Sequence, residues 1–286
     1  MSAHESTQTN RRDPAPTTAR TDPLDRALDA LPPRLDDTGD VTAAVRRLLA
    51  NLREATSGSE RLYATAGEGF FSEGGLFSLP RLLYFGARGA PGAVRLAFFT
   101  GWSGVELRGS HALLAFVHHL MRHPELAEGY NLLFYPLVNV TGFLDGTVRT
   151  RLGHELERAS WVAGVAPPEL RSIAADFPRH AAHGWFTLSV SEAVTRLLVK
   201  TRRLPVHPDY LPVDMSGVPV DWRPVKAEED RANSEKELAA LASGSFGLSI
   251  EIPSIWRPSQ YVPTVVAVLS EVLRRYRQAA SYGGEL

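Results

Sequence analysis

Apolar residues follow two alternating patterns along most of this chain. At helical spacing, Val45, Leu49 and Leu52 predict a first helix at about 41–54. Three continuous apolar runs, bounded by glycine-rich turns, are typical of strands buried on both faces; they lie at 62–65, 79–85 and 94–100. These patterns predict a chain in which helices cover a buried sheet.

Two further stretches place helices beside strands. The first has an amphipathic helix at 110–121, followed by a strand at 131–138. The second has a helix at 168–180, a strand at 185–190 and then a helix through Leu197 and Leu198. Strands joined through helices favour parallel pairing. The fold class is therefore α/β, a mixed, mostly parallel twisted sheet with helices on both faces.

The C-terminal third is less regular at first. Residues 201–233 carry several prolines and weak periodicity, which predicts a long irregular excursion. A capping-box pattern at Ser234 and Glu237 predicts a helix at 234–241, before a strand at 246–252. The last helix is expected at 261–276, with Pro263 in its first turn.

Composition limits the function classes. Residues 1–40 are rich in Thr, Asp, Arg and Pro without an apolar core, so we expect a disordered leader and a cytoplasmic protein, with one domain at 41–286. A net charge of -1 gives no basic field for nucleic acid or for an anionic membrane. The absence of cysteine excludes thiolate catalysis and cysteine-bound metal.

Four segments in order carry candidate chemistry, and each lies at or near a predicted strand end. They are residues 101–106 (GWSGVE), 136–143 (PLVNVTGF), 153–158 (GHELER) and 246–251 (FGLSIE). Together they resemble the M14 zinc carboxypeptidase superfamily, which includes the succinylglutamate desuccinylase and aspartoacylase branch. The resemblance covers roughly residues 60 to 280.

The departures from the family pattern bear directly on function. The family's first motif holds a His-x-x-Glu ligand pair; here Glu106 is kept and Ser103 replaces the histidine. In the segment 188–192, Ser191 stands where the family supplies its second ligating histidine. A serine hydroxyl is neutral, weakly donating and too short to replace an imidazole, so we expect no zinc and no other cofactor.

The resemblance also implies roles for the remaining polar residues. Glu251 matches the family's general base, and Arg158 matches an arginine that binds a terminal carboxylate, with Glu157 in place of the preceding asparagine. Arg149 lies near a further family arginine, one position out of register, as does Arg151. Without a cation, Glu106 and Glu251 face one pocket, so one must bind a proton or pair with Arg158.

The leading hypothesis is a protein that binds a peptide, amino acid or acyl-amino acid through its carboxylate, using Arg158, Ser103, Ser191, Arg149 and Glu157, without zinc-dependent hydrolysis. One alternative is a metal-independent enzyme with Glu251 and Glu106 as acid and base on an amide or acyl substrate. Another is a structural partner subunit whose old cleft is filled, with Trp102 occupying the space.

Two alternatives keep hydrolytic chemistry. A metallocarboxypeptidase could use replacement ligands, for which the candidates are His111, His154 and His183. A serine hydrolase could use Ser103 as nucleophile, because 101–105 nearly matches the Gly-x-Ser-x-Gly elbow. The base would then be His207 or His183, oriented by Asp209 or Asp214.

Overall fold

The structure of the protein is a computed structural model, which describes residues 39–73, 75–87, 92–162, 164–180, 183–204, 214–215, 218–225 and 245–283. The expected leader at 1–40 lies outside these residues, except for its last two, which begin the first helix. The predicted helix at 234–241 also lies outside them.

Nine strands of the described chain form one sheet in the order β1-β4-β6-β5-β7-β11-β8-β10-β9. In chain order they are β1 (Leu62–Ala66), β4 (Pro80–Phe85), β5 (Val94–Phe99), β6 (Tyr130–Tyr135), β7 (Gly184–Ser191), β8 (Leu197–Arg202), β9 (Asp214–Met215), β10 (Val218–Pro224) and β11 (Phe246–Pro253). The four central strands, β6, β5, β7 and β11, are parallel, and antiparallel pairs flank them on both sides. The predicted mixed α/β sheet is confirmed.

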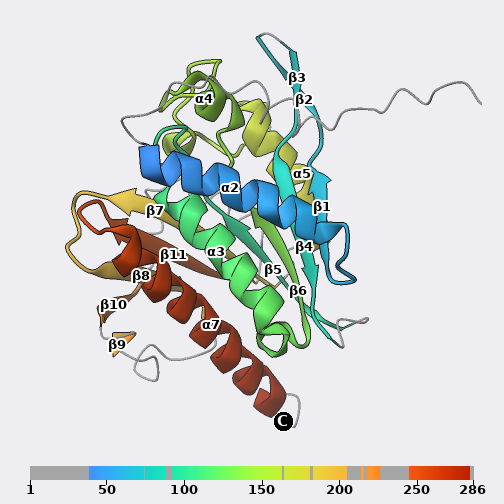
Figure 1. Cartoon of the computed structure of the whole chain (residues 1–286), viewed down its shortest axis with the longest axis vertical. Coiled ribbons are helices and arrows are strands. Elements are labelled where there is room, and N and C mark those ends of the chain that lie inside the picture. Colours follow the sequence, from blue (N-terminus) through green and yellow to red (C-terminus); the bar gives the residue numbers. More distant parts are fainter. Residues whose placement is uncertain are drawn as a thin grey trace, which may run out of the picture.

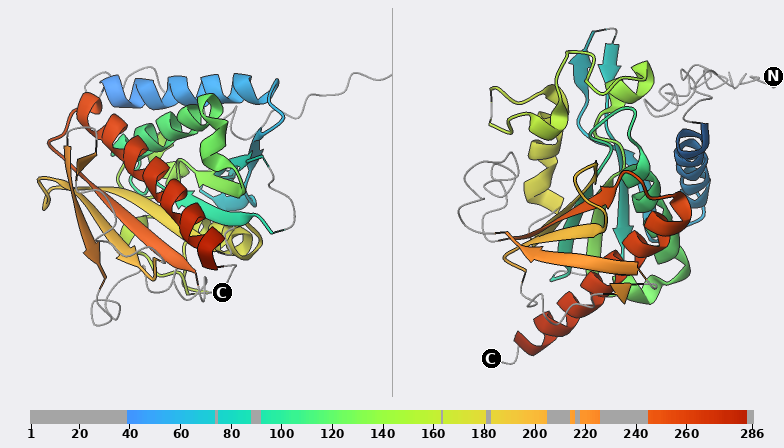
Figure 2. Two further views of the ribbon diagram at one scale, coloured as in Figure 1. Left: turned by 90° about the horizontal axis from the view of Figure 1, so that it is seen from below. Right: turned by 90° about the vertical axis from the view of Figure 1, so that its left-hand side faces the viewer.

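Helices lie on both faces of this sheet (Figures 1 and 2). One face is covered by α2 (Gly39–Thr56), α3 (Arg108–Arg122) and α7 (Pro258–Gly283), and the other carries α5 (Pro168–His180) with the short α4 (Val140–Asp145) near one end. The predicted strand–helix–strand unit is present as β5, α3 and β6. Shorter 3-10 turns lie at Pro124–Ala127 (η1) and Leu156–Arg158 (η2).

The core explains why the apolar runs are continuous. Phe98 on β5 stacks between Phe134 on β6 and Phe186 on β7, at ring-centre distances of 4.8 and 4.4 Å. All three are fully buried. Aromatic contacts across three parallel strands anchor the centre of the sheet, whose strand ends carry the candidate chemistry.

Two sequence predictions differ from the structure, and one element was not predicted. Leu197 and Leu198 begin strand β8 and not a helix, because this segment pairs with β11 on one side and β10 on the other. Part of the expected irregular stretch forms β10. A hairpin of β2 (Phe70–Ser72) and β3 (Gly75–Phe77), which the pattern did not predict, projects from the body (Figure 1).

No helix in the described part of the chain is both long enough and apolar enough to cross a membrane.

Candidate functional site

The carboxyl ends of the central parallel strands bring the predicted motifs to one edge of the sheet. Residues 101–106 follow β5, Ser191 ends β7, and Glu251 lies near the end of β11. In the register of β7 and β11, Glu251 is level with Ser189, and Ser191 is level with Pro253. Because side chains two apart share a face of a strand, Ser189, Ser191 and Glu251 are on the same face.

Two glycines allow the loop at 101–106 to approach the rest of this edge. Gly101 has φ +69°, and a Cβ there would lie 2.8 Å from the Leu137 Cα atom. At Gly104 a Cβ would lie 2.0 Å from the carbonyl carbon of Gly142, the third residue of α4. The loop is therefore pressed directly against the backbone of α4.

Asn139 is the structural link between this loop and α4. Its side-chain Oδ1 accepts a hydrogen bond from Gly142 N, which caps the helix, and its Nδ2 donates to Val148 O; both distances are 2.8 Å. Its backbone N–H donates to Gly101 O at 2.7 Å. Asn139 is fully buried. Asn139 of the second motif therefore has a structural role: it holds the loop at 101–106 against α4 and is not exposed to a ligand.

Ser103 and Glu106 are both engaged within the loop. The Ser103 Oγ atom accepts hydrogen bonds from the backbone N–H groups of Val105 and Glu106, each at 3.3 Å. The Glu106 carboxylate accepts from the backbone N–H of Arg108 at 3.1 Å and lies 3.3 Å from the Arg108 guanidinium. Arg108 was not among the predicted site residues, although its position two residues after Glu106 could have indicated it.

Glu155 holds the two predicted arginines of the neighbouring loop. Its carboxylate lies 2.6 Å from Arg149 Nη2 and 3.5 Å from Arg158 Nη1. The expected pairing of Arg158 with Glu106 or Glu251 is therefore wrong. The reason is local, since Arg158 lies one turn beyond Glu155 in the sequence and the Arg158 side chain remains 85% exposed.

Glu251 has a partner that sequence reasoning missed. Lys200 Nζ on β8 lies 2.5 Å from Glu251 Oε1 on β11. In the antiparallel register Lys200 is level with Ser249, two residues before Glu251, so both side chains extend from the same face of the sheet. The Glu251 side chain is 19% exposed. Because Lys200 and Glu251 lie on different strands, about 50 residues apart in the sequence, no local motif indicates their pairing.

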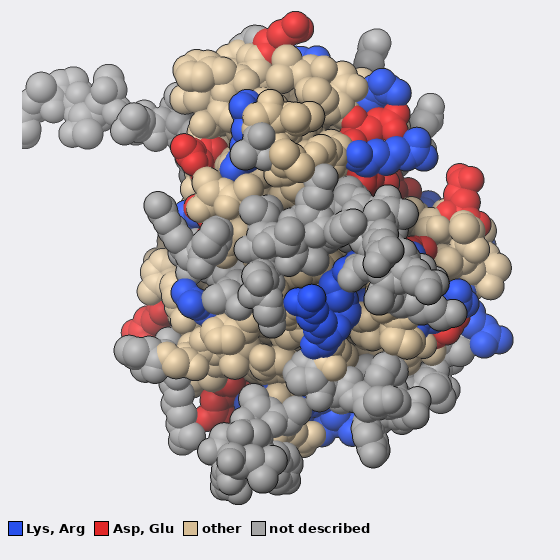
Figure 3. Space-filling view, turned by 180° about the vertical axis from the view of Figure 1, so that it is seen from behind, with Lys and Arg blue, Asp and Glu red and all other residues tan. Residues whose placement is uncertain are grey.

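A cavity of about 290 Å³ lies between the two loops. Of the predicted residues, Ser103, Glu157 and Arg158 line it, together with Trp102, Val148, Glu155 and Leu156. Trp102 is buried and meets Trp161 edge to face at 6.2 Å. Acidic and basic side chains lie side by side at the α4 end of the rear face (Figure 3). Ser191, Glu251 and Arg149 do not line this cavity.

Glu157 is the carboxyl group whose ionisation this site perturbs. Desolvation raises the pKa of Glu157, and the negative charges of Glu106, Glu155 and Glu251 raise it further, while Arg158 lowers it. Glu157 as a whole is nonetheless an exposed residue, so the desolvation acts on a side chain that still contacts solvent. The same influences show that four carboxylates gather at this edge of the sheet.

The residues at this edge do not fit a catalytic zinc ion. Within the described ranges, no three His, Cys, Asp or Glu side chains are grouped as they would be around a metal. The Arg108 guanidinium lies against the Glu106 carboxylate, where its charge would repel a cation. Ser103 Oγ accepts two backbone hydrogen bonds.

The three histidines considered as replacement ligands lie in different surroundings. His111 Nδ1 is 2.7 Å from the Tyr261 hydroxyl, which joins α3 to α7. His154 is exposed on the loop before η2. His183 precedes β7 and lies at the opposite edge, roughly 26 Å from Ser191 along an eight-residue strand path. His183 therefore cannot complete a site with Glu106.

The geometry also opposes the proposed serine triads. No described histidine is hydrogen-bonded to Ser103. His183 is again at the wrong edge, and Asp214 begins β9, five strands away from β5, a separation of roughly 24 Å. His207 and Asp209 lie outside the described residues.

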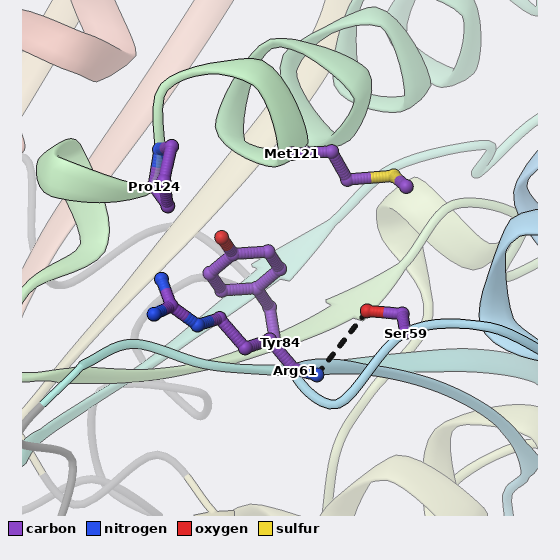
Figure 4. A pocket seen from close by; sticks show the side chains of 5 residues that line it. All are labelled: Ser59, Arg61, Tyr84, Met121 and Pro124. Carbon is purple, nitrogen blue, oxygen red and sulfur yellow. Dashed lines mark hydrogen bonds between the residues drawn. The ribbon is translucent and has the colours of Figure 1, made fainter.

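Two other cavities are remote from these motifs. One, of about 420 Å³, lies where the β2–β3 hairpin meets α5, and Phe71, Arg171 and Ser172 are among its lining residues. The other, of about 260 Å³, lies beside the C-terminal end of α3 (Figure 4). There the Tyr84 hydroxyl donates to Leu120 O at 3.0 Å, so its polar group is already satisfied by the helix.

Solved structures share this fold at low sequence identity. A protein from Shewanella amazonensis SB2B assigned to the metallopeptidases is 22% identical, with a TM-score of 0.59 over 82% of this chain and 94% of that one. A metallo-carboxypeptidase from Burkholderia cenocepacia is 13% identical, with a TM-score of 0.62 over 80% of this chain and 68% of that one. A metallo-carboxypeptidase from Pseudomonas aeruginosa, solved with (2-guanidinoethylmercapto)succinic acid, is 17% identical, with a TM-score of 0.58 over 80% and 69%.

These likenesses confirm the predicted resemblance to the zinc carboxypeptidase superfamily at the level of the fold. No model of a known protein family matches the sequence, and no curated protein matches it either. At such identities the fold carries no activity with it, so function must be argued from the site itself.

Proposed function

We propose that this carboxypeptidase-like chain binds an amino acid, a short peptide or an acyl-amino acid through its carboxylate and does not hydrolyse it with zinc. The observation that carries the proposal is the pairing of both inherited carboxylates. Glu106 is matched by Arg108 and Glu251 by Lys200, so each negative charge is balanced within the protein. A divalent ion would have to displace both cations.

The cavity supports a ligand that carries charge at one end and apolar groups at the other. Arg158 provides a largely exposed guanidinium, which can bind a carboxylate through two parallel hydrogen bonds. Trp102 and Leu156 are buried in the wall and offer an apolar surface. Ser191 and Arg149 lie outside this cavity, so we propose for them only a role in shaping longer ligands at the same edge.

Calorimetry can test ligand binding with N-acetyl-leucine and its amide. We expect N-acetyl-leucine to bind and the amide to bind at least tenfold more weakly, because the amide cannot form the paired hydrogen bonds with Arg158. Arg158→Ala should reduce binding of the acid similarly. Arg149→Ala is the matched control, because Arg149 shares Glu155 but does not line the cavity. Equal binding of acid and amide would contradict the proposal.

Hydrolysis must be tested separately. We expect purified protein to release no product from N-acylated amino acids or dipeptides, with or without added zinc. Turnover that requires zinc and disappears in Glu106→Gln would overturn the proposed loss of zinc chemistry.

A second candidate is metal-independent catalysis by Glu251 and Glu106. The four carboxylates at this edge of the sheet favour it, since such clusters can keep a proton for general acid catalysis. Two of the four, Glu155 and Glu157, line the cavity. Turnover that resists chelator and is lost in Glu251→Gln would establish this candidate. A cytoplasmic location stays a prediction.

A further inference from the structure

Two histidines lie together at the C-terminal end of α3, far from the candidate site. His119 and His123 are four residues apart, and their ring centres are 4.4 Å from each other. Side chains at this spacing are neighbours on one face of a helix. His119 is half-buried and His123 is exposed, so the pair is open to solvent on one side.

The ring spacing suits two imidazoles that bind one ion. Imidazole nitrogens lie about 2.0–2.1 Å from a bound zinc ion, which places the centres of two rings in adjacent tetrahedral positions roughly 5 Å apart. The observed distance of 4.4 Å is shorter than this, so the two rings must separate slightly to bind one ion.

Glu125 provides the supporting contact that such sites usually contain. Its Oε1 atom lies 3.3 Å from His123 Nδ1. A histidine that donates one ring N–H to a carboxylate keeps the lone pair of its other nitrogen for a metal, and the carboxylate increases the basicity of the ring. The Glu125 carboxylate therefore lies where it can support His123 as a metal ligand.

The charges around the pair are mixed. Arg122 precedes His123, whereas Glu125 and Glu128 follow it in η1 and at its end. Arg277 donates to Glu125 O at 2.9 Å and lies 3.9 Å from Glu128, leaving the Glu125 carboxylate directed to His123.

This place is distinct from the edge that carries Glu106. Eleven residues of α3 separate Arg108 from His119, a rise of roughly 17 Å along the helix. The C-terminal end of α3 also adjoins the cavity beside Pro124 shown in Figure 4. The pair is thus independent of the proposed ligand cavity.

We propose that His119 and His123 bind a divalent transition-metal cation, Zn²⁺ being the probe of choice, with Glu125 as the supporting carboxylate. Imidazole nitrogens are preferred ligands of this class of ion. Because no third protein ligand of the described chain completes the group, water molecules fill the remaining positions. Metal that co-purifies with the protein would then belong to α3 and not to the Glu106 edge.

Zinc titration of the full chain, after treatment with chelator, tests this site. We expect one Zn²⁺ bound by calorimetry, with a zinc-dependent rise in Tm. His119→Ala and His123→Ala should each weaken binding at least tenfold, and Glu125→Gln should weaken it by roughly tenfold. His118→Gln is the matched control, because the adjacent position lies on a different face of the helix and should leave zinc affinity unchanged. Tm values without zinc show whether each variant is folded.

The outcomes separate this inference from the proposed function. No zinc binding by the parent protein, or equal binding by His119→Ala and His123→Ala, would overturn the α3 site and leave the proposed function standing. Zinc binding that persists in the double variant and is lost in Glu106→Gln would overturn both.

Discussion

Lys200 on β8 and Glu251 on β11 form an ion pair, with 2.5 Å between Lys200 Nζ and Glu251 Oε1. The pair lies near the end of β11, beside the candidate site. Lys200 occupies a strand whose other neighbour is β10, so the pair links the central parallel strands to the antiparallel flank. The glutamate that the family resemblance assigns to general-base catalysis is therefore held by a cation of the chain itself. This ion pair supports the proposal that the site acts without zinc.

Replacing Lys200 by methionine should destabilise the fold by about 1 kcal/mol, because Glu251 would lose its partner while remaining mostly buried. Urea unfolding at pH 7 measures the change. In a Glu251→Gln background the same substitution should cost clearly less, since the charge to be balanced is gone. Equal costs in the two backgrounds would show that the pair contributes no coupling energy.

The strands were the most predictable part of the fold. Apolar runs identified β1, β4, β5, β6, β7 and β11. The central strands β5, β6, β7 and β11 are largely buried on both faces and need few polar positions, whereas β4 alternates and the edge strand β1 is mostly half-exposed. The segment at Leu197 was misassigned because a short apolar run can fit either structure until its pairing partners are known. Those partners, β10 and β11, lie more than 15 residues further along the chain.

Gly104→Ala should destabilise the protein by about 3 kcal/mol, because the new Cβ would meet the carbonyl carbon of Gly142 at 2.0 Å and neither backbone can move without disturbing α4. Thermal or urea unfolding measures the loss. Gly58→Ala is the control, since no atom lies within 4 Å of its added Cβ, and it should change stability by less than about 0.5 kcal/mol. A mild effect at Gly104 would mean that the loop and α4 are not in direct contact.

Sequence reasoning located only those site residues that lie at the ends of parallel strands. Motif order placed Glu106 and Glu251 at one edge, because parallel strands end together. The cations that balance them were missed. The contact between Lys200 and Glu251 exists because β8 pairs with β11, and the sequence around a lysine in a strand does not indicate which residue it will pair with. Glu155 was part of a recognised motif, but its hold on both Arg149 and Arg158 requires the turn geometry of that loop.

Glu157 should make stability decrease with rising pH. Desolvation and neighbouring carboxylates raise its pKa in the folded protein, so the folded state binds more protons than the unfolded state in the range above the ordinary glutamate pKa. Ionisation therefore disfavours folding at neutral pH. Glu157→Gln should be more stable than the parent at pH 7, and this difference should shrink below pH 4, where both states of the parent are protonated.

Urea unfolding of the two proteins between pH 3.5 and 7.5 provides the measurement. Glu60→Gln serves as a comparison, because Glu60 is an exposed glutamate before β1. A difference between parent and Glu157→Gln that does not change with pH would assign the effect to packing and not to the proton.

Placing histidines at positions 103 and 191 tests the proposed absence of zinc chemistry. In a His119→Ala, His123→Ala background, which removes the α3 site, Ser103→His with Ser191→His supplies two imidazoles beside Glu106. We expect this variant to bind zinc weakly, because the Arg108 guanidinium still lies 3.3 Å from the Glu106 carboxylate. Adding Arg108→Ala should then increase zinc affinity at least tenfold, measured by calorimetry. Arg257→Ala, an exposed arginine before α7, is the control and should not increase affinity. If Arg108→Ala has no effect, the Arg108 cation is not what limits zinc binding at this edge.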